Sequence, residues 1–575
     1  MFRKHNDIVI VTLSLHSVYI TILILLRNLN THKMKKIYFL SMLLLVTFTG
    51  FAQFTTTTYR GAFAPAPEAM WTDNWTEYDP QNKAYPTPTV TISSEITTNT
   101  TWTAGNTYSL GGQIYVKNNA TLTIEAGVII RSTAAGAGLF VTKGAKLIAE
   151  GTATSPIVFT SGNTIGNRSR GDWGGIILLG KGSFNINGGI NNIEGIPPGT
   201  DTQYGGGATP DDNDNSGSLK YVRIEYAGYT YGLAGSNTEI NGLTMGAVGR
   251  GTKIDYVQVS YANDDSFEWF GGAVDCSHLV AFNGLDDDFD TDNGFSGKIQ
   301  FCLAIRQPTA ADSSTSNCFE SDNNSTSAAG TSFTRAVFSN CTLVGPTYRA
   351  TLPSGGTLNT NHRRAAHLRR NTQLQIWNSV FMDFVDGVVV DGTTTITNAT
   401  NGTLKFKSNI IAGTVASKVA VKVESPTTAF DIAAWFTTNT NTSQTASAGL
   451  LTTPYNETDG SIYTGLDYRP ATGSIALSGA DFSTLSNDNF IASSEFSLVV
   501  YPNPTTNSFK LNYFSSSNEN VKVAAYDLTG KLLESRSVKY NEINNQEIGN
   551  GYNAGVYIVV LKQGNISKSV KVIKN

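Results

Sequence analysis

The chain has 575 residues, of which 15% are charged and 40% are hydrophobic, and its formal net charge is −4. The length is typical of about two to four domains, and the apolar fraction excludes a wholly disordered chain. A slightly negative charge without a long basic run argues against a nucleic-acid partner. The 55 glycines and the many Thr, Ser and Asn residues favour a β-rich fold with many turns.

The N-terminus contains two apolar runs, residues 8–26 and residues 37–51. The second follows Met34-Lys35-Lys36 and ends at small residues, which is the order of a secretory signal peptide over residues 34–52, cleaved between Ala52 and Gln53. We interpret residues 1–33 as an upstream extension. The alternative is a membrane helix, since about 20 apolar residues can span a bilayer. No apolar run of membrane length follows, so the mature protein is expected not to span a membrane.

Residues 53–100 are rich in Pro and Thr and include Trp71, Trp75 and Tyr78. We expect this segment to cap the first coil of the domain that follows it.

The segment 101–480 contains internal repeats. Residues 114–127 align with residues 139–151 at an offset of 25, so that Ile114 matches Leu139 and Leu122 matches Leu147. Residues 256–272 align with residues 278–294 at an offset of 22. Repeats of this length with two or three short alternating strands are typical of parallel β-helix coils, which bury their apolar faces only when they stack.

The predicted fold class is therefore all-β: a right-handed parallel β-helix of the pectin-lyase-like kind over residues 101–480, followed by a small C-terminal β-sandwich. Asn340, Asn378 and Asn409 begin apolar strands and are expected to stack as an asparagine ladder. The polar segments 185–217 and 308–330 are expected to be insertions on one edge of the coils, where solenoids commonly bind ligands.

An acidic column follows from the second alignment. Phe267-Glu268, Phe289-Asp290 and Phe319-Glu320 fall into one register. Neighbouring residues of a strand point to opposite faces, so the phenylalanines are expected to stack inward and the carboxylates outward, about 4.8 Å apart. Like charges directly opposite each other destabilise a sheet.

Three arrangements would relieve this repulsion. The first is a bound Ca²⁺, which takes six to eight oxygen ligands. The second is pairing with arginine: with Leu368 on the phenylalanine column, Arg369 would lie above Glu320. The third is solvation of the carboxylates. The candidate Ca²⁺ region consists of Asp264, Asp265, Glu268, Asp286, Asp287, Asp290, Asp292, Glu320 and Asp322.

Two classes of function remain open. A carbohydrate- or surface-binding protein would use exposed aromatic side chains, for which Trp269 and Phe270 are the candidates, with Trp173 and Tyr261 as further ones. A polysaccharide lyase or glycoside hydrolase acting on acidic polysaccharide would need a basic residue or paired carboxylates. The weak catalytic candidates are Arg369, Arg370, Asp287 and Asp288, with His362, Arg363 and Arg364 nearby.

Four cysteines, Cys276, Cys302, Cys318 and Cys341, permit two disulfides in an exported protein. The register places Cys302 and Cys341 inward on consecutive coils, where they can bridge or pack as small apolar residues. The pairing stays open.

After a linker at 481–498, the C-terminal residues 499–575 read as short strands separated by turns. Tyr501-Pro502-Asn503-Pro504, a Tyr-Asp-Leu-Thr-Gly-Lys turn at 526–531 and a strand with Gly555 and Tyr557 occur in that order. This set resembles the type A sorting domain of the type IX secretion system of Bacteroidetes. The resemblance implies the type IX machinery as a partner, with passage through the periplasm and outer membrane and a secreted or surface-attached product.

The solenoid resembles a group of secreted Bacteroidetes β-helix proteins that carry the same tail. Residues 144–154 and the sequence Asp172-Trp173-Gly174-Gly175-Ile176 carry this resemblance. It implies fold and compartment, and no particular reaction.

The charge is unevenly distributed. Residues 1–52 hold six basic and one acidic side chain, and residues 499–575 hold nine and five. Residues 264–322 hold twelve carboxylates against Lys298 and Arg306. The acidic character is thus concentrated on a few coils, where we look for a cation or a ligand.

Overall fold

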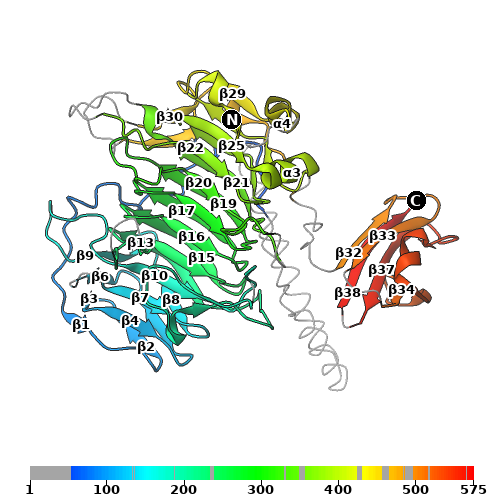
Figure 1. Cartoon of the computed structure of the whole chain (residues 1–575), viewed down its shortest axis with the longest axis horizontal. Coiled ribbons are helices and arrows are strands. Elements are labelled where there is room, and N and C mark those ends of the chain that lie inside the picture. Colours follow the sequence, from blue (N-terminus) through cyan, green and yellow to red (C-terminus); the bar gives the residue numbers. More distant parts are fainter. Residues whose placement is uncertain are drawn as a thin grey trace, which may run out of the picture. The chain divides into compact units, whose positions relative to one another are not determined.

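Short strands stacked in parallel dominate the computed structural model, which describes residues 54–575 except 133, 135, 187, 233–237, 329–331, 349–356, 424–429, 456–464, 484, 486–495, 516–518 and 565. The predicted signal peptide, its cleavage site and the segment 1–33 lie outside the described residues. Successive coils run from β1 to β29 (Figure 1). This architecture is a parallel β-helix, as the repeats predict.

One parallel sheet, here called sheet B, carries the acidic column on its outer face. Its ten strands within the described residues are, in chain order, β4 (Gln113–Val116), β7 (Gly138–Val141), β10 (Gly175–Leu179), β14 (Leu243–Gly246), β16 (Phe267–Phe270), β18 (Phe289–Asp292), β20 (Phe319–Ser321), β22 (Arg364–Leu368), β25 (Asp386–Asp391) and β28 (Ala420–Val423).

The other parallel sheet, sheet A, forms the remaining walls of the coils. Its strands in the described part of the chain are β1 (Val90–Ile92), β2 (Thr100–Trp102), β3 (Thr107–Leu110), β5 (Thr121–Ile124), β6 (Ile129–Ser132), β8 (Lys146–Glu150), β9 (Ile157–Ser161), β13 (Gly217–Glu225), β15 (Lys253–Ser260), β17 (Cys276–Phe282), β19 (Lys298–Ile305), β21 (Val337–Val344), β23 (Gln375–Trp377), β24 (Val380–Met382), β26 (Lys405–Lys407), β27 (Ile410–Ala412) and β29 (Thr442–Gln444).

The remaining described elements are short. They are the pairs β11 (Asn191–Asn192) with β12 (Gln203–Tyr204) and β30 (Leu451–Thr453) with β31 (Asp467–Pro470), the helices α3 (Thr393–Asn401) and α4 (Ile432–Thr438), and the 3₁₀ turns η1 (Thr200–Thr202), η2 (Pro346–Tyr348), η3 (Ala416–Lys418) and η4 (Ile475–Leu477).

The strand register confirms the repeats found in the sequence. Ile114 pairs with Leu139 and Leu122 with Leu147, at the offset of 25. Val257 pairs with Leu279, at the offset of 22. The inward side chains of both sheets form one continuous apolar core from Ile96 to Phe436. Burial of this core is the main favourable contribution to folding, because no single coil can shield its own inner face.

One residue per coil bends sheet A. Tyr221, Tyr256, His278 and Phe301 have φ values of 50°, 56°, 52° and 62°, and each lies between two paired stretches of its strand. Their rings stack from coil to coil, with centroids 4.4, 4.2 and 5.2 Å apart. Asn340 and Asn378 continue this column with φ values of 56° and 54°.

Asparagines bond along the solenoid axis at this bend. Asn409 Oδ1 accepts from the Ser379 N–H at 2.9 Å, and Asn441 Oδ1 accepts from the Asn409 N–H at 2.9 Å. Asn378 Nδ2 donates to Ser339 Oγ at 3.2 Å. The expected single ladder of Asn340, Asn378 and Asn409 is wrong, because Ser408 follows Asn378 at the bend position and Asn409 lies one residue further on, in register with Ser379. The asparagine side chains nevertheless satisfy backbone groups that the bend leaves without ladder partners.

The N-terminal segment differs from the expected cap. Residues 54–86, the N-terminal strap, lie along the flank of the solenoid and cross several coils. The Gly61 N–H donates to Asn378 O at 2.8 Å, the Trp71 ring lies 5.1 Å from that of His278, and Tyr85 Oη donates to Glu225 at 2.8 Å. Only the end of the predicted cap segment lies on the first coil, where Val90 of β1 pairs with Tyr108 of β3. Residues 54–86 do not cap that coil, because the stacked aromatic column forms an apolar strip along the flank, which Trp71 and Trp75 cover.

The predicted linker begins on the solenoid. Phe482 and Leu485 pack with Phe54 of the strap against Trp377, and Asp481 forms an ion pair of 2.9 Å with Lys407. Residues 486–495 lie outside the described part of the chain.

The C-terminal domain is a β-sandwich, as predicted. A sheet of β32 (Phe496–Tyr501), β33 (Phe509–Ser515) and β36 (Glu547–Ile548) faces a sheet of β34 (Val521–Asp527), β35 (Leu532–Val538), β37 (Gly555–Gln563) and β38 (Ile566–Lys574), with η5 (Tyr540–Asn545) between β35 and β36. Their inner side chains form a separate core.

The four cysteines are free thiols buried in the solenoid, and Cys302 pairs in register with Cys341 as expected. Burial raises the pKa of the Cys302 thiol well above its usual range.

We expect the native protein to resist an alkylating reagent at all four thiols, because a thiolate is the reactive form. After unfolding without reductant, mass spectrometry should find four alkylated cysteines. Recovery of only two would show that a disulfide forms.

Candidate functional site

The acidic column lies on the outer face of sheet B. Glu268 of β16 pairs with Asp290 of β18, and Asp290 pairs with Glu320 of β20. Phe267, Phe289 and Phe319 stack inward beside them, with ring centroids 5.8 and 5.2 Å apart. The alternation of a pleated strand therefore places three carboxylates in line on one face, as the sequence predicts.

Further carboxylates come from the turns that lead into these strands. The Asp287 N–H donates to Asp265 Oδ1 at 2.8 Å, and Ser314 Oγ donates to Asp286 Oδ2 at 2.8 Å. The Asp265 N–H donates to Asn241 Oδ1 at 3.2 Å. These bonds fix the turns, so their carboxylates are held beside the column.

Seven side chains form what we call the acidic cluster, and three overlapping triads within it have carboxylate oxygens within 4.8 Å of one another. Two oxygens, Asp286 Oδ1 and Asp290 Oδ1, are buried and have no hydrogen-bond partner among the described residues. The triads are Asp264, Asp265 and Asp286; Asp265, Glu268 and Asp290; and Asp287, Asp290 and Glu320.

The pKa values of the carboxyl groups in this cluster are raised mainly by burial and, to a smaller extent, by neighbouring carboxylates. Burial, with a smaller effect of neighbouring carboxylates, raises the pKa of Asp265, Glu268 and Asp290 well above the usual range. Burial raises the pKa of Asp286 to about 7, although its bond from Ser314 acts in the opposite direction. At neutral pH the cluster is therefore electrostatically strained unless protons or a cation neutralise it.

The insertion at 185–217 contributes a carboxylate that the sequence analysis missed. Glu194 lies beside Glu268, and burial raises the pKa of Glu194. Glu268 also accepts a hydrogen bond from Asn241 Nδ2. The insertion covers the outer face of sheet B, where Ile193 and Tyr204 pack on Phe270. This segment is not part of a repeat, so the sequence could not predict which coils it covers.

Arginine neutralises one end of the column. Arg369 forms ion pairs with Glu320 and, at 2.8 Å, with Asp322, while Arg370 Nη1 lies 2.6 Å from Asp322 Oδ2. Although burial acts in the opposite direction, His367 and Arg369 lower the pKa of Glu320. The proposed pairing of Arg369 with Glu320 is thus present.

The register that led to this pairing was wrong. Ala366 pairs with Phe319, and His367 pairs with Glu320, so Leu368 lies two positions beyond the phenylalanine column. The connection between β20 and β22 is much longer than one repeat, so the repeat offset could not predict how the two strands pair. Arg369 reaches Glu320 through the length of its side chain.

Asp292 and Asp322 lie outside the triads. Both Asp292 oxygens accept from Asn293, and Asp322 is bound by the two arginines. Burial, followed by the charge of Asp322, raises the pKa of Asp292 to about 8. In the described residues no lysine or arginine forms an ion pair with Asp264, Asp265, Glu268, Asp286, Asp287 or Asp290.

Several candidates are corrected by their burial. Asp288 is 0% exposed and forms an ion pair of 3.0 Å with Arg306, so it cannot act on a ligand. Trp269 is 0% exposed, because alternation places it inward beside Phe267. Phe270 points outward but is covered by Tyr204. Neither aromatic residue is a free stacking surface.

The remaining aromatic and basic candidates are also largely occupied. Trp173 is buried and its Nε1 donates to Glu225 O at 2.8 Å. The Arg170 guanidinium lies over the Tyr261 ring. Burial lowers the pKa of His362 to about 3, and its Nε2 lies 3.0 Å from Gln307 O. Of the basic residues before β22, Arg363 is exposed and Arg364 is half-buried.

A family described as a pectate-lyase-like β-helix domain matches residues 94–457. The chain belongs to the pectate-lyase-like β-helix family. The secretion system C-terminal sorting domain matches residues 499–575. No curated protein matches the chain.

The comparison with solved structures found a weakly similar chain. It is the tailspike protein gp49 from Acinetobacter baumannii bacteriophage Fri1, a capsular polysaccharide depolymerase. The sequence identity is 11%, the match covers 82% of this chain and 73% of the tailspike, and the TM-score is 0.13.

The sorting domain assigns this pectate-lyase-like protein to type IX export, to the cell surface or the medium. Asn503 of the Tyr-Pro-Asn-Pro turn links β32 to β38: its Oδ1 accepts from the Ile573 N–H at 2.8 Å and its Nδ2 donates to Lys571 O at 2.9 Å. Gly555 begins β37, and Tyr557 Oη donates to Asn553 O at 2.8 Å.

None of the helices among the described residues has the length and hydropathy of a membrane-spanning segment.

Proposed function

We propose that this exported β-helix protein binds Ca²⁺ in its acidic cluster and uses the surrounding face to hold a carbohydrate at the cell surface. The observation that carries the proposal is the set of three overlapping carboxylate triads with two buried oxygens that lack partners.

The chemistry of the cluster supports a hard cation. Each triad offers three carboxylates, and Ca²⁺ takes six to eight oxygens at about 2.3–2.6 Å, including backbone carbonyls and water. A divalent cation would convert the repulsion between cross-strand carboxylates into attraction. Arginine already serves this purpose for Glu320 and Asp322, which leaves the part of the cluster around Asp265 and Asp290 for a metal.

The wider face supports a hydroxylated ligand. Carboxylates, Ser314 and the arginines Arg369 and Arg370 offer hydrogen-bond acceptors and donors along several coils of sheet B. Polar groups on successive coils of a rigid solenoid suit a chain of sugar rings, which presents hydroxyl groups at regular intervals.

Asp290→Asn should weaken Ca²⁺ binding at least about tenfold, because Asp290 belongs to two of the triads. Isothermal titration of Ca²⁺ into chelator-treated protein measures this. Asp201→Asn is the matched control, since it removes a surface carboxylate paired with Lys117. Binding equal to that of the unaltered protein in Asp290→Asn would contradict the assignment, as would the absence of Ca²⁺ binding in the unaltered protein.

Glycan cleavage is the second candidate function, and two observations favour it: the Asp286 carboxyl lies within 4.8 Å of those of Asp264 and Asp265, and its pKa is raised. A carboxyl group with a pKa of about 7 beside carboxylates resembles the general acid of a glycosidase. Incubation with a panel of polysaccharides separates the candidates. Retention without products indicates a binding protein, whereas new reducing ends or unsaturated products indicate an enzyme.

A further inference from the structure

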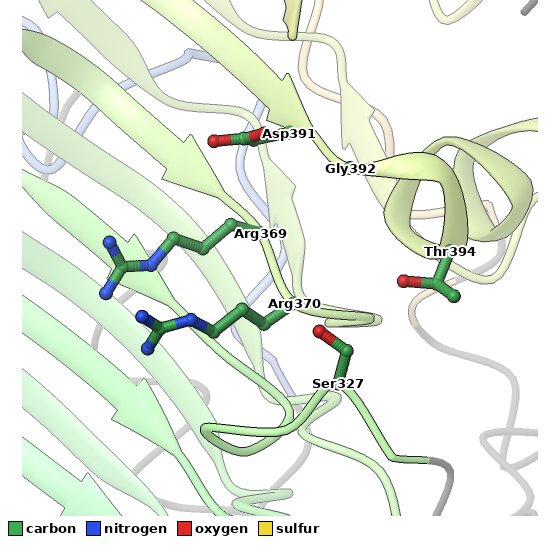
Figure 2. A pocket seen from close by; sticks show the side chains of 6 residues that line it. All are labelled: Ser327, Arg369, Arg370, Asp391, Gly392 and Thr394. Carbon is green, nitrogen blue, oxygen red and sulfur yellow. The ribbon is translucent and has the colours of Figure 1, made fainter. Parts of the chain in front are cut away.

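The pocket between β22, β25 and the start of α3 does not gather its polar groups around one point. Figure 2 shows that the Arg369 and Arg370 side chains extend away from Thr394. Both guanidinium groups are already paired with Asp322. The N-terminal strap, in contrast, connects coils that are far apart along the solenoid.

The strap crosses the coils in the reverse of their chain order. Residues 54–62 contact strands from β19 to β29, Trp71 and Trp75 contact β13, β15 and β17, and Pro86 accepts a bond from Arg131 of β6. We infer that the strap is a conformational device: it docks only after the last coil has formed, and it then couples the coils so that they open together. This inference does not depend on what the acidic face binds.

Arg60 links the start of the strap to the last coil. Its side chain is 6% exposed, and its Nε donates to Ser478 O at 2.9 Å. Nη1 donates to Thr442 Oγ1 at 2.8 Å and Nη2 to Ile475 O at 2.6 Å. These acceptors follow Arg60 by 382 to 418 residues. Burial of a charged guanidinium without acceptors is strongly unfavourable, so this end of the strap is stable only once β29 and η4 are in place.

The two tryptophans join neighbouring coils in the middle of the strap. Trp75 is 1% exposed, and its ring centroid lies 5.8 Å from that of Tyr221 on β13 and 6.0 Å from that of Tyr256 on β15. The Trp71 ring centroid lies 5.1 Å from that of His278 on β17. Separation of these coils would expose the rings to water, so their burial depends on several coils at once.

Hydrogen bonds fix the other end of the strap to earlier coils. The Glu77 N–H donates to Gln258 Oε1 at 2.9 Å, and Gln258 Nε2 donates to Glu77 O at 2.7 Å. Arg131 Nη1 donates to Pro86 O at 3.2 Å. One continuous segment is therefore bound both to β29 and to β6.

These contacts change how the solenoid can open. Without such a segment a solenoid can open coil by coil from its ends, because each coil contacts only its neighbours. Opening of the last coil would remove the acceptors of Arg60 and loosen Gly61 and Ala62, which bond to Asn378 and Thr342 on earlier coils. The free energy of opening one coil thus includes contacts with others. Late docking follows from the long loop that the strap closes.

Pulsed hydrogen exchange during refolding of the mature protein tests the order of docking. The amides of Gly61 and Ala62, which donate to Asn378 O and Thr342 Oγ1, should become protected after those of β27. In the folded protein, Arg60→Met should lower the protection of these two amides at least about tenfold. Arg363→Met, which changes an exposed arginine, is the matched control and should leave it unchanged. Protection of the strap before or together with β27 would overturn the inference.

A cut in the folded protein tests the coupling. Residues 66–69 are exposed, so a site for a specific protease inserted between Glu68 and Ala69 separates Arg60 from the tryptophans. Because the cut is made after folding, the result does not depend on whether a variant folds. Native-state exchange in β24 and β27 should become at least about tenfold faster after the cut.

The matched control carries the same site between Ala208 and Thr209, which are exposed in the insertion. That cut interrupts the chain between β12 and β13 but leaves the strap whole, so exchange in β24 and β27 should not change. The coupling is refuted if cutting the strap leaves this exchange unchanged, or if the control cut accelerates it equally.

Discussion

Replacing Arg306 with alanine should lower the free energy of unfolding by about 3–5 kcal/mol, the range found when one partner of a buried ion pair is removed. Arg306 is 1% exposed and lies 3.0 Å from Asp288, which is 0% exposed. Its guanidinium also donates to Asn317 O at 2.6 Å and to the carbonyls of Leu285 and Asp286. The substitution leaves a buried carboxylate uncompensated and takes the guanidinium donors from the carbonyls of Asn317 and Asp286, whereas Leu285 O keeps its bond from Ser316 Oγ at 2.7 Å.

Chemical denaturation of the mature protein measures this effect. Arg363→Ala is the matched control and should stay within about 0.5 kcal/mol, because that arginine is exposed. The double variant Arg306→Met with Asp288→Leu should be more stable than Arg306→Ala alone, since it removes both charges. A loss below about 1 kcal/mol for Arg306→Ala would mean that Asp288 is neutral or solvated in the native protein.

The second large effect concerns pH and Ca²⁺. In chelator, stability should fall as the pH rises from about 5 to 8. The folded protein holds Asp286 and Asp292 with pKa values of about 7 and about 8, both raised mainly by burial above the usual value of 3.8. A group with a raised folded pKa stabilises the protein below its unfolded pKa, and that contribution is lost as the pH rises through the folded pKa. Each unit of difference corresponds to about 1.4 kcal/mol per group.

Calcium should reverse this loss. At pH 8 Asp286, whose pKa is about 7, is mostly ionised, and a cation at about 100 times its dissociation constant adds about 2.7 kcal/mol to the stability of the folded state. Melting temperatures at pH 5, 6, 7 and 8, with EGTA and with Ca²⁺, measure both effects. Asp290→Asn should show a smaller response to Ca²⁺ than Asp201→Asn. A melting temperature in EGTA that rises over this range, or one that ignores Ca²⁺ at pH 8, would contradict the prediction.

The repeat offsets predicted the parts of the fold that depend on alternation. The pairs Ile114 with Leu139 and Phe267 with Phe289 are in register, and so is the column of Glu268, Asp290 and Glu320. A pleated strand has a side-chain period of two, so one correct register assigns the inward or outward direction of every residue on it. The same rule, applied to Trp269, predicts that it points inward like Phe267 two residues before it, as the structure shows.

What the sequence determined by itself is the repeating solenoid, its acidic face, and the sorting domain that follows, because each of these is local or periodic. Only the tertiary structure decided the path of the N-terminal strap, the place of Glu194 beside Glu268, the register of β22 and the pairing of Arg306 with Asp288. These contacts join segments that are not related by the repeat, so no sequence offset predicts them. They form because stacking of the coils leaves an apolar strip exposed and charges buried, and another segment of the chain must cover the strip or pair with the charge.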